Sequence, residues 1–315
     1  MTENANLKRR VRARAAKTSE SYTAARRHLV GTDETSSRRM VIATAQSVLR
    51  PDPRSRDQLR ASGARIRAMM RDAAAAGASL AHFPEGALCS PHKRVVSSRG
   101  LEVVADADWG LVDRAALRAE LDVVARVARD LKLWVAVGGI DFAPGRSRPT
   151  NSLFVISGRG AIVGRYDERM LSRTKSLYMY EAGTRSLVFE VGGVRFGCAL
   201  GMESQYPELF AAYERDDVDC VLLSTAGNPE FPEVFAVEAA GHATANSLWV
   251  SYAGPVGQHQ PPAGVVTPNG AWTARCASAD RDGMVFTEID TSTCERARTW
   301  RRCVREGRTH VSAHR

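Results

Sequence analysis

The chain has 315 residues, of which 44% are hydrophobic and 25% charged, and its net charge is +9. These values are ordinary for a soluble globular protein with one large core. No apolar run approaches the roughly 20 residues of a membrane-spanning helix, and the N-terminus lacks the apolar segment of a signal peptide. The six cysteines form no C-x-x-C or zinc-finger pattern. Composition therefore indicates a cytoplasmic protein with buried, reduced thiols and no membrane partner.

The positive charge is concentrated at the N-terminus. Residues 1–39 hold ten Lys and Arg against four acids, which is +6 of the +9 and leaves +3 for the other 276 positions. We expect residues 1–38 to form a basic helical arm and linker, and residues 39–315 to form one domain with a C-terminal helical tail. The arm is either a dock for nucleic acid or a partner, or a solvated or oligomer-packed extension. Nucleic-acid binding is expected only through this arm.

From Arg39 onward, the spacing of apolar residues predicts alternating strands and helices. The expected elements are a strand at 40–46, a helix at 56–76, a strand at 79–83, a helix at 112–131, a strand at 133–139, a hairpin of 151–156 with 161–166, a hairpin of 187–191 with 194–200, a helix at 207–215, a strand at 218–224, a helix at 234–247, a strand at 248–253, two strands flanking the turn at 268–270, a strand at 284–290 and a basic helix at 292–304. Strand–helix units interrupted by hairpins favour helices packed outside two sheets.

Three motifs follow one another along the body. Residues 80–85 read L-A-H-F-P-E, residues 164–171 read G-R-Y-D-E-R-M-L, and residues 194–209 read V-R-F-G-C-A-L-G-M-E-S-Q-Y-P-E-L. Together they resemble the nitrilase (carbon–nitrogen hydrolase) superfamily, whose second and third motifs run G-x-Y-x-K-x-H-L and V-x-x-G-x-x-I-C-x-D-x-x-F-P-E-L. The resemblance covers about residues 40–310. It implies an α/β fold, a four-layer α-β-β-α sandwich, and assembly as a homo-dimer or larger even oligomer.

The resemblance also implies three catalytic positions, two of which are substituted. Family members use a glutamate base, a lysine that stabilises the oxyanion and a cysteine nucleophile. Glu85 matches the glutamate, whereas Glu168 stands at the lysine position and Gly201 at the cysteine position. With the charge reversed, the site should repel an oxyanion. The sequence therefore predicts a degenerate catalytic triad, and not a Cys-dependent amidase or nitrilase.

Two cysteines and two cations near these motifs could replace the lost groups. Cys198 lies three residues before Gly201 on the same strand, so it should point to the opposite face. No motif places Cys89 as a nucleophile. Arg169 should face away from the site, whereas Lys175 in the following loop is free to supply a cation.

The paired carboxylates become the centre of the expected site. Two close carboxylates disfavour double ionisation, and such a pair could bind an amine, hold a metal or perform acid–base work. The alternative is drift in a pocket without catalytic demand. The further candidates for ligand binding are Lys175, Ser176, Met202 and Glu203. Ser176 stands where many family members carry a second glutamate, and Glu203 is also expected to bond the backbone of the elbow.

No cofactor and no metal are expected. Only His310 and His314 have H-x-x-x-H spacing, and they lack the Glu of a zinc-protease motif. His82 is expected to be a satisfied core histidine.

Three functions remain open, so whether the chain is an enzyme remains open as well. The principal expectation is a pseudoenzyme that binds a small nitrogen-containing ligand or a partner. The second is a repurposed enzyme that uses Glu85 and Glu168 for acid–base chemistry on a small amide, nitrile or amine. The third is a nucleic-acid-associated module that acts through the arm.

Overall fold

The structure is a computed structural model, and it describes residues 8, 12–13, 38–91, 95–97 and 107–305. The chain divides into two compact units, Met1–Arg38 and Arg39–Arg315. The predicted helices of the arm therefore lie outside the described residues, apart from three positions, and so do His310 and His314. The strands and helices predicted for the body, and the three predicted catalytic positions, all belong to the second unit.

Every strand and helix predicted for the body is present, with ends that differ by at most two residues. The strands are β1 (Arg39–Ser47), β2 (Leu80–His82), β3 (Trp134–Asp141), β4 (Thr150–Ile156), β5 (Ile162–Asp167), β6 (Val188–Val191), β7 (Val194–Leu200), β8 (Cys220–Ser224), β9 (Trp249–Pro255), β10 (Gly264–Val266), β11 (Trp272–Arg275) and β12 (Gly283–Asp290). The helices are α3 (Arg56–Ala75), α4 (Arg114–Leu131), α5 (Pro207–Arg215), α6 (Val234–Asn246) and α7 (Ser292–Arg305).

The long helices begin where polar side chains cap them. Ser55 accepts a hydrogen bond from the backbone N–H of Gln58 before α3, and Asp113 accepts one from Ala116 before α4. Such caps satisfy donors that the first turn of a helix leaves unpaired. Helix α4 ends at Leu131, and its C-cap residue, Lys132, adopts the left-handed conformation with φ +53°. No helix in the described part of the chain is long and apolar enough to cross a membrane.

The strands form two half-sheets that meet along a short seam. One half has the order β5-β4-β3-β2-β1-β12, and the other has the order β6-β7-β8-β9-β10-β11. Strands β1 and β9 join them through the pairs Gln46–Gly254 and Ser47–Pro255. Strands β1, β2 and β3 run parallel, as do β7, β8 and β9. The carboxyl ends of these strands therefore gather at one edge, where ligands of α/β proteins bind.

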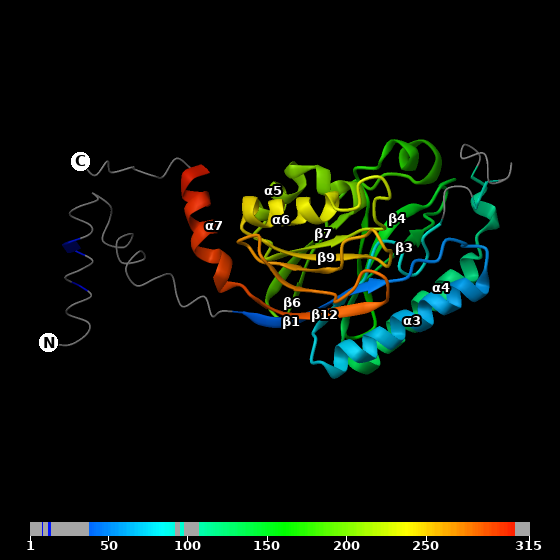
Figure 1. The fold of residues 1–315 in the computed structure, drawn as a ribbon, viewed down its shortest axis with the longest axis horizontal. Coiled ribbons are helices and arrows are strands. Elements are labelled where there is room, and N and C mark those ends of the chain that lie inside the picture. The colour runs from blue at the N-terminus through cyan, green and yellow to red at the C-terminus, as the bar shows by residue number, and fades with distance from the viewer. Residues whose placement is uncertain (1–7, 9–11, 14–37, 92–94, 98–106, 306–315) are drawn as a thin grey trace. The chain divides into compact units, whose positions relative to one another are not determined.

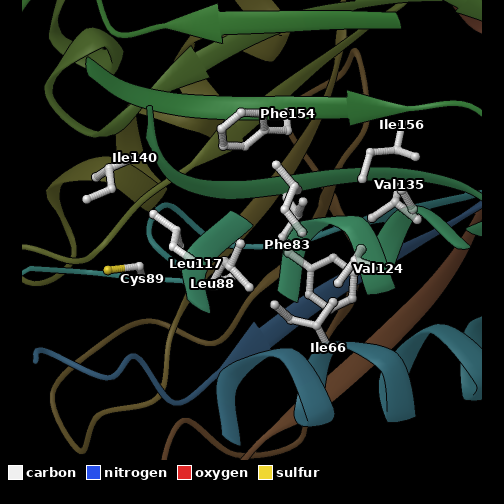
Figure 2. Packing of buried hydrophobic residues seen from close by; sticks show 14 of the residues in the cluster. Ile66, Phe83, Leu88, Cys89, Leu117, Val124, Val135, Ile140, Phe154 and Ile156 are labelled. Atoms are coloured by element: carbon white, nitrogen blue, oxygen red, sulfur yellow. The ribbon is translucent and has the colours of Figure 1, made fainter. Parts of the chain in front are cut away.

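Helices cover the outer face of each half-sheet. Figure 1 shows α3 and α4 side by side on one face and α5 and α6 on the other. One apolar cluster lies under α3 and α4, and Figure 2 shows Ile66, Phe83 and Phe154 within it. A second cluster, including Leu153 and Phe196, fills the space between the half-sheets, and a third packs under α5 and α6. The predicted four-layer α-β-β-α sandwich is confirmed.

Candidate active site

The three positions that the motifs predict lie together at the carboxyl ends of strands. Glu85 follows β2, Glu168 follows β5 directly, and Gly201 is the first residue of the 3-10 turn after β7. The parallel strands β2 and β7 belong to different half-sheets, so the site lies where the two halves approach each other. Glu85 is 5% exposed and Glu168 is fully buried.

Lys175 joins the two carboxylates. Its Nζ lies 2.5 Å from Oε1 of Glu85 and 2.7 Å and 3.0 Å from the two oxygens of Glu168. The lysine is the first residue of a single π-helical turn, Lys175–Met179. Short π-helical segments are rare and occur frequently at functional sites.

Two further donors hold the carboxylates in place. The Asn151 amide nitrogen donates to Glu85 Oε1 over 2.9 Å and to Glu168 Oε2 over 2.6 Å. The backbone N–H of Ala226, just after β8, donates to Glu85 Oε2 over 3.1 Å. A buried charge needs such partners, since an unpaired one is strongly destabilising. The four side chains and this N–H form a closed network, hereafter the Glu–Lys–Glu network.

The environment keeps Glu168 poised near neutral pH. Burial, together with the nearby Glu85 carboxylate, raises the pKa of Glu168 to about 7, against the opposing effect of the Lys175 ammonium. Burial acts to lower the pKa of Lys175, but the two carboxylates outweigh it and raise that pKa above its ordinary value. Lys175 is therefore a permanent cation, and Glu168 can gain or lose a proton.

The predicted repulsion of an oxyanion considers the carboxylates alone, and the structure adds a cation to them. The motifs assign Glu168 to the family's lysine position, and the structure places the positive group of another residue beside it, since Lys175 lies between both carboxylates. The carboxylate pair is not uncompensated, because the Lys175 ammonium lies between the two groups and offsets one of their two negative charges. Within the described residues, no group of three or more His, Cys, Asp or Glu side chains is placed to hold a metal ion.

Gly201 is the position that the motifs assign to the nucleophile. A Cβ built on Gly201 would lie 2.7 Å from Glu85 Oε2 and 3.4 Å from Lys175 Nζ. Any side chain at this position would therefore touch both the base and the cation. Glycine offers neither sulfur nor oxygen there, and its φ of +47° is in the left-handed region that glycine tolerates best.

Neither neighbouring cysteine takes over the role. Cys198 is fully buried in the cluster between the half-sheets, whereas Ala199 belongs to the cluster on the other face, as strand alternation requires. Cys89 lies among Leu88 and Leu117 under α3 and α4 (Figure 2). Burial raises the pKa of the Cys89 thiol to about 12, so it stays protonated and unreactive at neutral pH.

The other predicted residues separate into those at the site and those away from it. Met202 lines the cleft that opens onto the network, but Ser176 is exposed outside it, where its carbonyl accepts a hydrogen bond from Arg148. Glu203 is not a ligand-binding residue, because it is buried and accepts hydrogen bonds from Tyr166 Oη and from three backbone N–H groups. Arg169 contacts Tyr166 and points away from the carboxylates.

This cleft has a volume of about 1000 Å³. Glu85, Lys175 and Gly201 line it, whereas Glu168 is fully buried and does not. Asn151 and Ala226 are members of the network that are not among the predicted site residues. For Asn151 the available signal is its place in the Asn-Ser pair at the start of the predicted hairpin, whereas a backbone donor such as Ala226 has no sequence signal.

Comparison with known proteins agrees with this arrangement. Residues 50–299 match the family model described as carbon–nitrogen hydrolase. No curated protein matches the chain by sequence.

Several solved structures share the fold. Nit3 of Saccharomyces cerevisiae, a member of branch 10 of the nitrilase superfamily, is 16% identical, with a TM-score of 0.66 over 88% of this chain and 96% of that one. The NitFhit protein of C. elegans is 18% identical, with a TM-score of 0.67 over 85% of this chain and 65% of that one. The glutamine-dependent NAD+ synthetase of Acinetobacter baumannii is 17% identical, with a TM-score of 0.64 over 81% of this chain.

This chain spans 46% of the synthetase and 65% of NitFhit, so it corresponds to one part of those longer proteins. Similarity at this level of identity shows a shared fold. The family model, in contrast, covers most of the chain. On that match, the protein belongs to the carbon–nitrogen hydrolase family, the nitrilase superfamily.

Proposed function

We propose that this protein is a pseudoenzyme with respect to thiol chemistry and that it binds a small nitrogen-containing molecule noncovalently in the cleft. The observation that carries the proposal is the geometry at Gly201, where a side chain would meet Glu85 and Lys175 but none exists. Covalent catalysis on amides needs a nucleophile at that point. The base and the cation remain, and they supply a fixed polar floor to a cleft large enough for a small molecule.

The position of the thiols supports the same proposal. All six cysteines lie among the described residues, and none of them lines the cleft. Burial raises the pKa of Cys89, Cys198 and Cys220 above the ordinary thiol value. The proposed function therefore needs no covalent step.

Intact-protein mass spectrometry tests the proposal. The purified protein is incubated with small amides and nitriles, and its mass, the release of ammonia and its melting temperature are followed. We expect some compounds to raise the melting temperature and none to leave an acyl adduct on the protein. We also expect no release of ammonia that depends on a free thiol, so alkylation with iodoacetamide should change nothing. Thiol-dependent turnover that disappears in Cys89→Ser would overturn the proposal, and Cys303→Ser, at a partly exposed cysteine of α7, serves as the matched control.

A second candidate function, hydrolysis by water, is favoured by one observation. Glu85 Oε2 and Lys175 Nζ face the same point beside Gly201, so a water oxygen there would have a base and a cation beside it. In this reaction the water oxygen bonds to the amide carbon while Glu85 takes its proton. The C–N bond then breaks, and Glu85 returns the proton to the departing amine.

The second candidate predicts turnover that survives iodoacetamide and disappears in Glu85→Gln. Ammonia release that is equal in Glu85→Gln and in the wild type would eliminate it. If the wild type releases ammonia in a reaction that needs Glu85 and no thiol, the protein is an enzyme and the pseudoenzyme proposal is wrong.

The remaining expectations are separate proposals. Nucleic-acid binding through residues 1–38 predicts salt-sensitive binding that is lost when residues 1–36 are deleted. Assembly as a homo-dimer or larger even oligomer predicts a corresponding mass in light scattering. Neither depends on the chemistry of the cleft.

A further inference from the structure

Another pocket of the body shares no lining residue with the cleft. Its volume is about 570 Å³, within the range of about 300–1,000 Å³ that is usual for small-molecule sites. Its walls come from the loop between β3 and β4 with the first residue of β4, from β5, and from the segment 181–187 ahead of β6. It is therefore a separate site from the cleft.

The segment ahead of β6 is fixed against the β4–β5 hairpin. The backbone N–H of Glu181 donates to the carbonyl of Pro149 over 2.9 Å. The backbone N–H of Gly183 donates to the carbonyl of Glu168, also over 2.9 Å. A Cβ on Gly183 would collide with the carbonyl oxygen of Asp167, so the two backbones are in direct contact. The pocket is thus bounded by backbone that is held in place.

The charges around this pocket are mostly positive. Two carboxylates, Asp167 and Glu181, line it, and a third, Asp141, pairs with one of its arginines. Counting all three, four positive groups face three negative ones, which leaves a surplus of one positive charge. The positive groups are Arg146, Arg148, Arg165 and Arg185.

Two of these arginines take up all three carboxylates. Arg165 pairs with Asp141 and, over 2.8 Å, with Asp167. Arg146 pairs with Glu181 over 2.6 Å. The other two arginines of the pocket therefore have no carboxylate partner among the residues that the structure describes.

Arg148 and Arg185 are those two residues. Nη1 of Arg148 donates to the carbonyl of Ser176 over 2.7 Å, which holds the side chain without neutralising it. Arg185 is exposed and has no ion pair or hydrogen bond within the described part of the chain. The hydroxyls of Thr184 and Ser186, on either side of it in the sequence, also line the pocket. The pocket thus offers two guanidinium groups and two hydroxyls to a ligand.

These donors suit a phosphoryl group. A guanidinium stays charged and presents parallel N–H donors that match two oxygens of a phosphate. A phosphate monoester has three acceptor oxygens and a charge of about −1.5 to −2 at pH 7, so it can bind two guanidinium groups at once. A single carboxylate has two oxygens and one charge. The pocket is also larger than a phosphate ion, which leaves room for an organic group.

We infer that this pocket binds a small phosphate monoester, whose phosphoryl oxygens accept hydrogen bonds from Arg148 and Arg185. The site lies outside the cleft and does not depend on the function proposed for the cleft.

Isothermal titration calorimetry with two phosphate monoesters, ribose 5-phosphate and glycerol 3-phosphate, tests the inference. Ribose and succinate are the comparison probes, and every titration is made at one ionic strength because salt screens exposed charges. We expect at least one ester to bind roughly tenfold more tightly than succinate, a difference of about 1.4 kcal/mol. Ribose should show no measurable binding.

Three variants locate the binding. Arg185→Gln removes a guanidinium on which no described contact depends, and it should weaken ester binding roughly tenfold, or about 1.4 kcal/mol. Arg185→Lys keeps the charge but lacks the planar fork, so it should restore only part of the affinity. Arg159→Gln, at an exposed arginine of the β4–β5 turn outside the pocket, makes the same change of charge and should bind like the wild type. Far-ultraviolet circular dichroism verifies that each variant is folded.

Several results would overturn the inference. It is wrong if neither ester binds at millimolar concentration, or if succinate binds as tightly as the esters. Equal weakening by Arg185→Gln and Arg159→Gln would show a general attraction to a positive protein instead of a site. Full recovery in Arg185→Lys would contradict recognition by a guanidinium group. None of these results bears on the function proposed for the cleft.

Discussion

The protonation of Glu168 makes a specific prediction about stability. Its pKa is 4.5 in the unfolded chain and about 7 in the folded one. Because the folded state holds this proton more tightly, the contribution of Glu168 is fully present below about pH 4.5 and is lost as the pH rises through about 7. At about 1.36 kcal/mol per pKa unit, the loss amounts to roughly 3 kcal/mol of unfolding free energy.

The variant Glu168→Gln removes this linkage. Its unfolding free energy, minus that of the wild type, should rise by roughly 3 kcal/mol between pH 4.5 and pH 8. The variant also changes contacts with Asn151 and Lys175, but that change is a constant offset, so the pH slope alone carries the prediction. Comparison with the wild type is essential, because His82 titrates in the opposite sense.

Urea denaturation followed by circular dichroism at pH 5, 6, 7 and 8 measures the slope. Glu230→Gln, at an exposed glutamate of the loop before α6, is the control and should give a flat difference. A flat difference for Glu168→Gln, or one that falls with pH, would refute a raised pKa for Glu168 within the Glu–Lys–Glu network.

Three further variants probe the same region by denaturant unfolding. Lys175→Met should cost about 3–5 kcal/mol at pH 8, as breaking a buried ion pair does, and less at pH 5, where Glu168 takes up a proton; equal losses would contradict this. Gly201→Ala should cost about 1–2 kcal/mol for its left-handed backbone, and no loss would contradict the φ of +47°. Burial lowers the pKa of His82 from 6.5 to about 3, so the contribution of His82 to stability should fall by roughly 5 kcal/mol as the pH drops through that window. The unfolding free energy of His82→Gln minus that of the wild type should therefore rise by this amount as the pH drops, and a flat difference would contradict the lowered pKa.

The arrangement of the body follows closely from the sequence because burial imposes its own periodicity. Buried strands such as β8 are continuous apolar runs, and amphipathic helices such as α4 repeat apolar residues every three or four positions. Strand ends differ from prediction by a residue or two because the hydrogen-bond ladder, and not the apolar pattern, ends a strand. For example, Val218 is fully buried but lies before β8 begins.

The sequence predicts some residues of the site and not others. Glu85 and Gly201 follow rigid strands with strong motifs, so their meeting is predictable. The segment after the second motif, from residue 172 to β6, has no such motif, and the position that the resemblance assigns to a second glutamate there is Ser176. The π-helical turn directs Lys175, which the sequence offers as a possible cation, into the site and leaves Ser176 exposed. Local patterns do not reveal which of two neighbouring residues faces inward in an irregular turn.

The narrow seam between the half-sheets has a mechanical consequence. Strands β1 and β9 share only the pairs Gln46–Gly254 and Ser47–Pro255, and the residues next along each segment, Val48 and Val256, both line the cleft. A ligand bound in the cleft would therefore contact the chain directly beyond both ends of this seam. We expect its binding to slow hydrogen exchange at the ends of β1 and β9, which makes exchange there a measure of whether the cleft is occupied.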